Sequence, residues 1–379
     1  MSARRIRFLA LAFLSLVLLF LTLARSFMPG LSAERSSRDL SLLESVIKLV
    51  RDDYIERVDA DRTMEGAFRG LIQALDPLSS YLSRADLSQY LQAGSGPRFD
   101  TGIILIKEPG GMPRVLGLEE GRPAAKSGVR PGDFVSAVDE QSTFGLSLEE
   151  IRLRLRSREN RPVKLRVVRQ TATVELSVER SLPPAGDCAF APEKNTSGVL
   201  TVRRMSPSLN GQAAAALPDA AKTSSAPLIL DLRSCTEGDP ESARKFINIF
   251  LKADTAGMFL SRDGKQEPFS CPGEQAWKTT PLVVWTGQAT LGAPEIVAGV
   301  LQAFKRARVV GHRTQGLTAR QTLFPLEDGS ALLLTTGVFA LASGEKLWER
   351  GVIPDVDLGA QQAGRDAYLK KTLETAGDR

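Results

Sequence analysis

The chain has 379 residues, which is long enough for two or three domains. Its hydrophobic share of 42% and charged share of 25% are those of a folded globular protein and exclude a largely disordered chain. The net charge of +5 comes from scattered arginine and not from a dense basic block with interleaved aromatics, so we expect no nucleic-acid partner.

The N-terminus carries a targeting signal. Arg4, Arg5 and Arg7 precede an uncharged apolar run over residues 8–24. This run lies between the usual length of a signal-peptide core, about 7–15 residues, and that of a membrane-spanning helix, about 17–25. We therefore expect residues 1–25 to be a membrane anchor or a signal, and favour the uncleaved anchor. The leading arginines predict a single pass through the inner (cytoplasmic) membrane, with the bulk of the chain in the periplasm or extracytoplasmic space.

The next segments are a linker and a helical region. Residues 26–39 contain proline, glycine and several serines and are typical of a linker. Apolar residues with helical spacing predict helices over residues 40–54 and 62–75, the second ending at Asp76-Pro77. Residues 40–94 are therefore expected to form an N-terminal helical region.

Residues 95–180 are predicted to form a compact domain of strands with one helix. Its elements are a strand after Thr101-Gly102-Ile103-Ile104, a turn Pro123-Ala-Ala-Lys-Ser-Gly128, a Gly132-Asp133 strand, a helix over residues 146–155 and an alternating strand over residues 163–168. This order resembles a PDZ domain. The resemblance implies that backbone N–H groups of Thr101, Gly102, Ile103 and Ile104 bind the terminal carboxylate of a peptide tail, and that the strand pairs with the peptide by edge addition. The alternative is a buried strand with a turn glycine and no ligand.

Residues 181–360 alternate strands and helices. Residues 198–202, 227–232 and 281–285 are apolar strands, residues 214–221 are helical in pattern, and Pro294 is suited to the first turn of a helix. This alternation predicts a layered α/β domain, followed by a C-terminal helix or tail over residues 361–379. The expected fold class is multidomain α/β plus β.

Two motifs in this domain point to a family. Residues 288–296 read Gln-Ala-Thr-Leu-Gly-Ala-Pro-Glu-Ile, and residues 314–317 read Thr-Gln-Gly-Leu. They resemble the Ser-Ala-Ser-Ala-Ser-Glu-Ile and Thr-x-Gly-Lys motifs of the carboxy-terminal processing (tail-specific) peptidases, family S41, which implies a crotonase-like (ClpP-like) core. The resemblance places the nucleophilic serine at Gly292, the lysine base at Leu317 and its supporting glutamine at Gln321.

The oxyanion region of the resemblance is also altered. Residues 230–238 read Leu-Asp-Leu-Arg-Ser-Cys-Thr-Glu-Gly, so that Gly238 is kept while Glu237 replaces a family glycine. Together with Ala293, these residues occupy the family's oxyanion positions. A carboxylate directed into such a site would repel the negative charge that develops during acyl transfer.

These substitutions predict a pseudopeptidase, because glycine has no nucleophile and leucine accepts no proton. The protein would bind C-terminal tails through its PDZ domain and act as a scaffold or as a regulator of an active S41 relative. One alternative is an active peptidase whose nucleophile is Thr290, exposed on the same turn, or Cys235 paired with His312. Another is a purely structural envelope protein whose PDZ groove is closed.

The few cysteine and histidine residues limit the disulfides and metal sites that the chain can form. Cys188, Cys235 and Cys271 allow one disulfide, whose pairing the sequence leaves open. His312 is the only histidine, and the chain contains no CxxC pair, so we expect no metal site and no cofactor.

Overall fold

The computed structural model describes residues 41–93, 96, 98–217, 224–273, 277–359 and 364–376. The chain divides into two compact units, Met1–Glu65 and Gly66–Arg379. The predicted anchor (residues 1–25) and linker (residues 26–39) lie outside the described residues. Within the described part of the chain, no helix has the length and apolar character needed to cross a membrane.

The N-terminal region contains the predicted helices and one strand that was not predicted. Helix residues 41–53 and α2 (Ala60–Gln73) confirm the two helical patterns, and α3 (Arg84–Ala93) follows. Between α2 and α3 lies β1 (Ser80–Leu82), which pairs antiparallel with β18 (Ala331–Leu341). All three residues of β1 are buried, so the strand has no polar alternation that could have revealed it. The region expected to be helical, residues 40–94, therefore also contains a short strand, β1.

Residues 99–181 form the domain predicted as PDZ-like. A sheet in the order β2-β3-β4-β6-β7, with β5 paired to β4, packs against α4. The bounds are β2 (Ile103–Ile106), β3 (Arg114–Leu118), η1 (Pro123–Lys126), β4 (Phe134–Val138), β5 (Gln141–Ser142), α4 (Leu148–Leu155), β6 (Val163–Arg169) and β7 (Ala172–Val178). Strand β2 is an edge of this sheet, as peptide addition would require.

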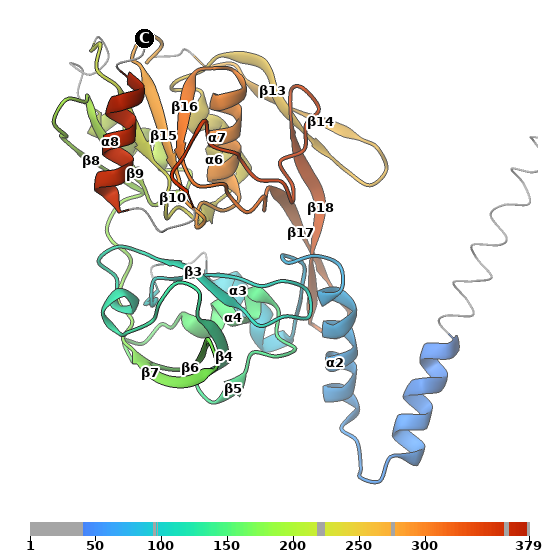
Figure 1. Ribbon diagram of the computed structural model, residues 1–379. Helices are drawn as coiled ribbons and strands as arrows, with labels where there is room; N and C mark the ends of the chain where they lie inside the picture. Colours follow the sequence, from blue (N-terminus) through green and yellow to red (C-terminus); the bar gives the residue numbers. More distant parts are fainter. Residues whose placement is uncertain are drawn as a thin grey trace, which may run out of the picture. The chain divides into compact units, whose positions relative to one another are not determined.

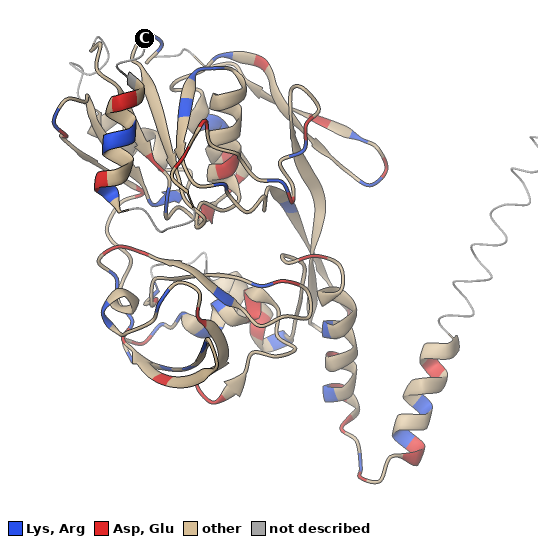
Figure 2. Ribbon diagram, in the orientation of Figure 1, with Lys and Arg blue, Asp and Glu red and all other residues tan. Residues whose placement is uncertain are grey.

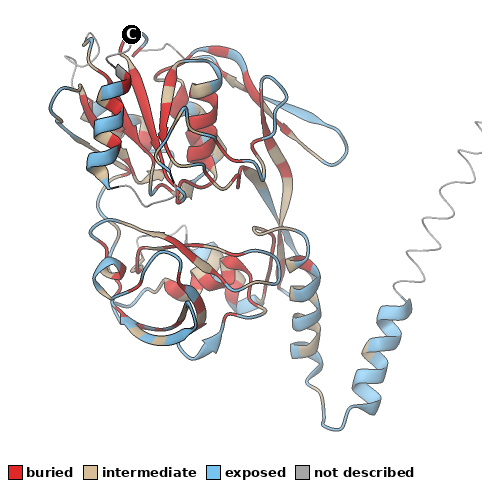
Figure 3. Ribbon diagram, viewed as in Figure 1, coloured by how far each residue is buried: buried red, intermediate tan, exposed pale blue. Residues whose placement is uncertain are grey.

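The C-terminal domain is built on a sheet in the order β19-β16-β15-β11-β9-β8, parallel except at β8 (Figure 1). Leu228 and Leu230 of β11 pack with the helices α5, α6 and α7, whereas Ile229 packs with Tyr368 of α8. Both faces of the central strands are therefore covered, and Figure 3 shows these strands buried. This confirms the predicted α/β layering. The bounds are β8 (Cys188–Ala191), β9 (Gly198–Val202), α5 (Leu209–Ala216), β11 (Leu228–Asp231), α6 (Pro240–Ile247), β15 (Leu282–Thr286), α7 (Ala293–Ala303), β16 (Ala307–Gly311), β19 (Val356–Asp357) and α8 (Arg365–Ala376).

A second sheet joins this domain to the N-terminal region. Its order is β1-β18-β13-β14, and β17 pairs with β18. The remaining strands are β13 (Ala253–Leu260), β14 (Gln266–Cys271), β17 (Ala319–Pro325) and the short parallel pair β10 (Arg204–Met205) and β12 (Glu237–Gly238). Figure 2 shows basic and acidic residues interspersed over the strands and helices, which agrees with the scattered arginine of the sequence.

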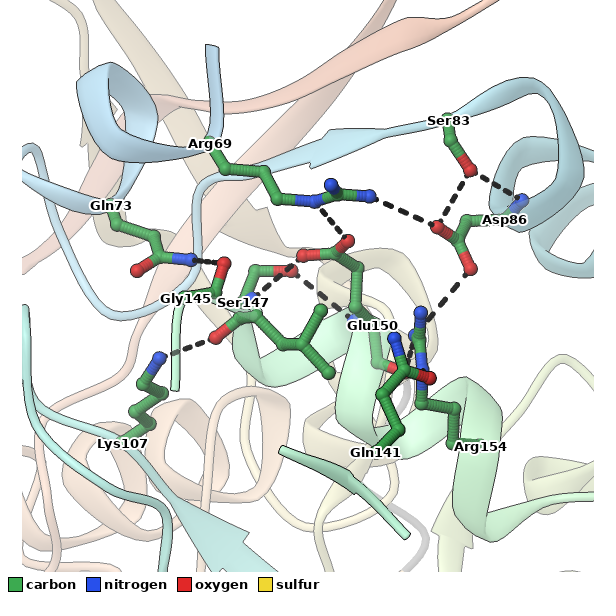
Figure 4. Close-up of polar contacts among 11 residues, drawn as sticks. Arg69, Gln73, Ser83, Asp86, Lys107, Gln141, Gly145, Ser147, Glu150 and Arg154 are labelled. Carbon is green, nitrogen blue, oxygen red and sulfur yellow. Dashed lines mark hydrogen bonds and ion pairs between the residues drawn. The ribbon is translucent and has the colours of Figure 1, made fainter. Parts of the chain in front are cut away.

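A polar network fastens α4 to the segment before the PDZ-like domain (Figure 4). The Glu150 carboxylate is fully buried and accepts hydrogen bonds from Arg69 Nε at 2.8 Å and from the backbone of Ser147 at 2.7 Å. The Ser147 hydroxyl in turn accepts from Glu150 N at 3.2 Å, which makes a capping box at the start of α4. Buried Lys107 donates to the carbonyl of Leu146 beside this cap, and burial lowers the pKa of its ammonium group. Buried hydrogen bonds of Glu150, Ser147 and Lys107 thus stabilise the start of α4.

The network predicts a strong effect of Arg69→Met. This change leaves the buried Glu150 carboxylate without its guanidinium partner, and breaking a buried ion pair costs about 3–5 kcal/mol. The matched control is Arg166→Met, whose pair with Glu175 is 3.1 Å long but has side chains 47% and 75% exposed, so that about 0–1 kcal/mol is expected. Chemical denaturation of both variants measures the difference. Equal shifts of the two midpoints would contradict the role given to Glu150.

Candidate active site

Gly292 begins α7 and has a backbone that favours glycine. It follows the turn after β15, caps the helix at φ +76°, and is followed by Pro294 in the first turn, as the sequence predicted. A Cβ placed on Gly292 would meet only the Leu317 carbonyl oxygen, at 3.8 Å. The position expected for a nucleophile therefore has room for a side chain and carries none.

Glu295 connects the loop of Gly292 to the loop of Leu317. Its fully buried carboxylate accepts hydrogen bonds from the backbone N–H groups of Gly292 at 2.7 Å, Gly316 at 2.6 Å and Leu317 at 2.9 Å, and from the Thr314 hydroxyl at 2.5 Å. Burial raises the pKa of the Glu295 carboxyl, and these four donors oppose the rise. The two positions of the predicted dyad are thus held together through main-chain atoms.

Leu317 lies in an apolar cluster that both domains build. It is 7% exposed and packs with Ala289 and Leu291 of its own domain and with Ile104 and Leu116 of the PDZ-like domain. We call these five residues the seam cluster. Gly117 of β3 permits the close approach, because a Cβ there would lie 3.2 Å from Ala289 Cβ. The place predicted for a lysine base is therefore filled with hydrocarbon.

Glu237 is also in contact with the PDZ-like domain. Its carboxylate forms an ion pair with Arg156, whose Nε donates to Asp100 at 2.9 Å. The neighbouring Gly238 packs so closely against β10 that a Cβ would lie 2.4 Å from Met205 Cβ, and Ala293 is buried at the start of α7. The carboxylate at the family's glycine position is thus paired with a cation. Arg156 was not among the predicted site residues, because no motif marks it.

Gln321 has a structural hydrogen bond. Its side-chain amide donates to the backbone carbonyl of Leu78 at 2.8 Å, which joins β17 to the segment before β1. This contact needs no lysine at position 317.

The alternative nucleophiles do not fit the structure. The Thr290 hydroxyl is not exposed as expected: it is fully buried, donates to Leu232 O at 2.8 Å and accepts from Gly287 N at 2.9 Å. Burial raises the pKa of the Cys235 thiol, which is fully buried, so a thiolate is disfavoured. His312 has an edge contact with the Tyr368 ring. These positions therefore lack the exposed and activated group that the alternative of a nucleophile at Thr290 or Cys235 requires.

The cysteines are unpaired and the described residues hold no metal-binding cluster. Cys188, Cys235 and Cys271 are all free thiols, so the disulfide that the sequence allowed is not formed. Within the described ranges, His, Cys, Asp and Glu side chains form no group of three or more that would hold a metal ion.

The predicted carboxylate-binding loop is bonded to its own chain. Thr101 is fully buried, Ile103 is half-buried, and Ile104 lies in the seam cluster. Gly102 N donates to Asp100 Oδ1 at 3.0 Å, and Ile103 N donates to the Thr101 hydroxyl at 3.3 Å. The face of Gly102 is covered, since a Cβ there would lie 2.4 Å from Arg122 Cβ. Two of the four predicted amides are therefore already used within the loop.

The contacts of Glu295 predict a large loss of stability in Glu295→Gln. The amide keeps one acceptor oxygen but turns an NH₂ group toward N–H donors, and each buried group left unsatisfied costs about 1–3 kcal/mol. Glu241→Gln on α6 is the control, because its side chain is 54% exposed and its ion pairs contribute about 0–1 kcal/mol. The free energy of unfolding of both variants is measured by urea titration. A midpoint for Glu295→Gln as high as that of the control would rule out this role.

Comparison with known proteins agrees with this architecture. Residues 196–358 match the family model of peptidase family S41, and residues 114–169 match that of the PDZ domain. The carboxy-terminal processing protease CtpA of Bacillus subtilis (strain 168) is 26% identical over 94% of this chain and 76% of its own length. A probable CtpA-like serine protease of Staphylococcus aureus (strain COL) is 26% identical over 84% of this chain, and this chain covers 65% of that relative.

A solved structure has the same fold. The photosystem II D1 C-terminal processing protease superposes with a TM-score of 0.71 at 23% identity, over 86% of this chain and 90% of that one. The predicted resemblance is thereby confirmed: residues 196–358 are similar to peptidase family S41 and residues 114–169 to the PDZ domain, in a fold shared with that processing protease.

Proposed function

We propose that this protein is a non-catalytic relative of the carboxy-terminal processing proteases that binds C-terminal peptide tails through its PDZ domain. It acts as a scaffold or as a regulator of an active S41 relative. The observation that carries the proposal is the filled cleft: Gly292 supplies no hydroxyl, and Leu317 packs against the PDZ domain where a base would stand. A hydroxyl nucleophile needs an adjacent base, and both are missing.

The location of the protein is part of the same proposal. Arginines ahead of an apolar run favour an anchor in the inner (cytoplasmic) membrane, with residues after it in the periplasm or extracytoplasmic space. A tail-binding domain placed there would meet exported proteins. Protease accessibility in intact and permeabilised cells tests this: export is contradicted if the domains are cleaved only after the inner membrane is opened.

A closed, purely structural envelope protein is the second candidate. It is favoured by the burial of Thr101 and Ile104 and by the internal hydrogen bonds of Gly102 N and Ile103 N. Titration of the full chain with a peptide library ending in free carboxylates separates the two candidates. Saturable binding supports tail recognition, and its absence supports the structural role.

The proposal predicts that the full chain does not cleave peptides. Unstructured substrates with free tails are expected to stay intact, and a hydroxyl-directed covalent inhibitor should label no residue of the chain. Enzymes typically turn over at about 1–1000 per second. The proposal would be contradicted if the purified chain cleaved the substrates at such a rate and the inhibitor abolished this activity.

The filled cleft also predicts the result of Leu317→Lys. The introduced ammonium group would be buried among the apolar residues of the seam cluster, where desolvation disfavours the charged form. The thermal midpoint should fall at pH 7 and partly recover near pH 10. The reason is that a depressed pKa in the folded state penalises folding only where the unfolded lysine is protonated. The control, Leu317→Met, conserves volume and should cost less than about 1.5 kcal/mol. Similar midpoints at pH 7 for the two variants would show that the cluster is not closed in solution.

A further inference from the structure

A cavity of about 130 Å³ lies beside the carboxylate-binding loop and is lined by both domains. Its arginines come from distant segments: Arg98, Arg122 and Arg156 from the PDZ side, and Arg203 and Arg204 from the S41 domain. Its carboxylates are those of Asp100, Glu119 and Glu237. Five arginines thus face three carboxylates, so the lining carries two net positive charges.

The arginines are unequally paired. Arg122 lies 3.3 Å from Glu119, Arg156 pairs with Asp100 and Glu237, and Arg204 lies 3.2 Å from Asp187. In contrast, Arg98 and Arg203 have no ion pair with any described carboxylate. Among the described residues, the Arg203 side chain donates a hydrogen bond to the Ala185 carbonyl, at 3.4 Å.

Arg98 is the most unusual of these groups. Its Nη2 atom is buried and has no hydrogen-bond partner among the described residues. Burial lowers the pKa of its guanidinium, and the positive charges of Arg158 and Arg156 lower it further. Withdrawing such a donor from water without an acceptor is unfavourable, and two unpaired cations at one cavity favour an anion between them.

The carboxylates do not remove this excess. Burial raises the pKa of the Glu119 carboxyl, and neighbouring Asp100 raises it further, so this group is a weaker counter-charge than an exposed glutamate. Asp100 and Glu237 are both engaged by Arg156. Within the part of the chain that the structure describes, no carboxylate therefore balances the charge of Arg98.

We propose that this cavity binds an oxyanion group, and that its occupant is the terminal carboxylate of a peptide tail. The inference rests on the proposed tail-binding function, but it assigns binding of the carboxylate to arginine side chains instead of the backbone amides of the loop. The amides of Gly102 and Ile103 are bonded within the loop, so the arginines at the cavity, and Arg98 and Arg203 above all, hold the carboxylate in their place. Guanidinium groups match the geometry of a carboxylate or phosphate. The cavity of about 130 Å³ has room for one such group.

The test uses the full chain and the double variant Arg98→Gln/Arg203→Gln. The probes are a fluorescent peptide library with degenerate tails and free carboxylates, the same library with C-terminal amides, and inorganic phosphate. Arg166→Gln/Arg262→Gln removes the same charge from exposed positions away from the cavity and is the control. We expect the amide library to bind at least about tenfold more weakly than the free acids. The double variant should lose a similar factor and the control should not.

Stability provides an independent readout. Removing an arginine with a structural role lowers the thermal midpoint, whereas Arg98→Gln removes like-charge repulsion from Arg156 and Arg158 and should leave the midpoint unchanged or raise it. Phosphate should raise the midpoint of the wild type but not of the double variant.

The outcomes are distinguishable. Free-acid tails that bind the wild type and the double variant equally overturn this inference and leave tail binding intact. Stabilisation by phosphate that needs the two arginines, without any tail binding, supports the oxyanion site and removes the proposed tail-binding function. Absence of both effects overturns both proposals.

Discussion

The arrangement of the loops at Gly292 and Leu317 depends on one buried carboxylate. Glu295 accepts three backbone N–H groups and one hydroxyl, and so joins the start of α7 to the loop of residues 314–317. Because the backbone donors at Gly292, Gly316 and Leu317 are main-chain atoms, the tie does not require serine or lysine side chains there. This explains how both chemical groups are missing while the loops keep their places. The hydrogen bonds that hold the two loops in place are therefore independent of the side chains at positions 292 and 317.

The side chains at the substituted positions 317 and 237 both contact the PDZ-like domain. Leu317 contributes to an apolar seam with Ile104 and Leu116, and burial of a leucine side chain stabilises by about 1.5–3 kcal/mol. Glu237 pairs with Arg156, but its side chain is 44% exposed, so this pair contributes about 0–1 kcal/mol. Of these two contacts between the PDZ-like and S41-like domains, the apolar one therefore contributes more to stability. The ion pair between Arg156 and Glu237 fixes the relative position of two side chains and contributes little to stability.

The sequence was sufficient for the elements and for the register of the motifs, but not for the contacts between segments. Strands such as β11 have apolar runs that identify them, and Glu295 with Ile296 aligns the family motif without a structure. In contrast, β1 is fully buried and short, and the Thr290 hydroxyl is hidden because it bonds to Leu232 O, a residue 58 positions away. The arginines of the cavity are spread from position 98 to position 204, and no spacing rule relates them. The hydrophobic periodicity of a sequence predicts helices and strands, but it does not predict contacts between side chains that are far apart in the chain.

Arg156 connects the two conclusions about this protein. Burial lowers the pKa of its guanidinium, but the nearby carboxylates, chiefly Glu237 and Asp100, outweigh this effect and raise the pKa, and Arg156 also lines the arginine cavity. A carboxylate bound in that cavity competes with Glu237 for the same cation, and each ligand of Arg156 weakens the attraction of the other. By thermodynamic reciprocity, whatever loosens the Glu237 contact strengthens the binding of the tail, and a bound tail loosens the contact by the same factor. Because the seam cluster does not include Arg156 or Glu237, such a tail would weaken the ion pair without opening the cluster. In the proposed function, Arg156 would thereby provide a route by which tail binding in one domain alters the surface of the other.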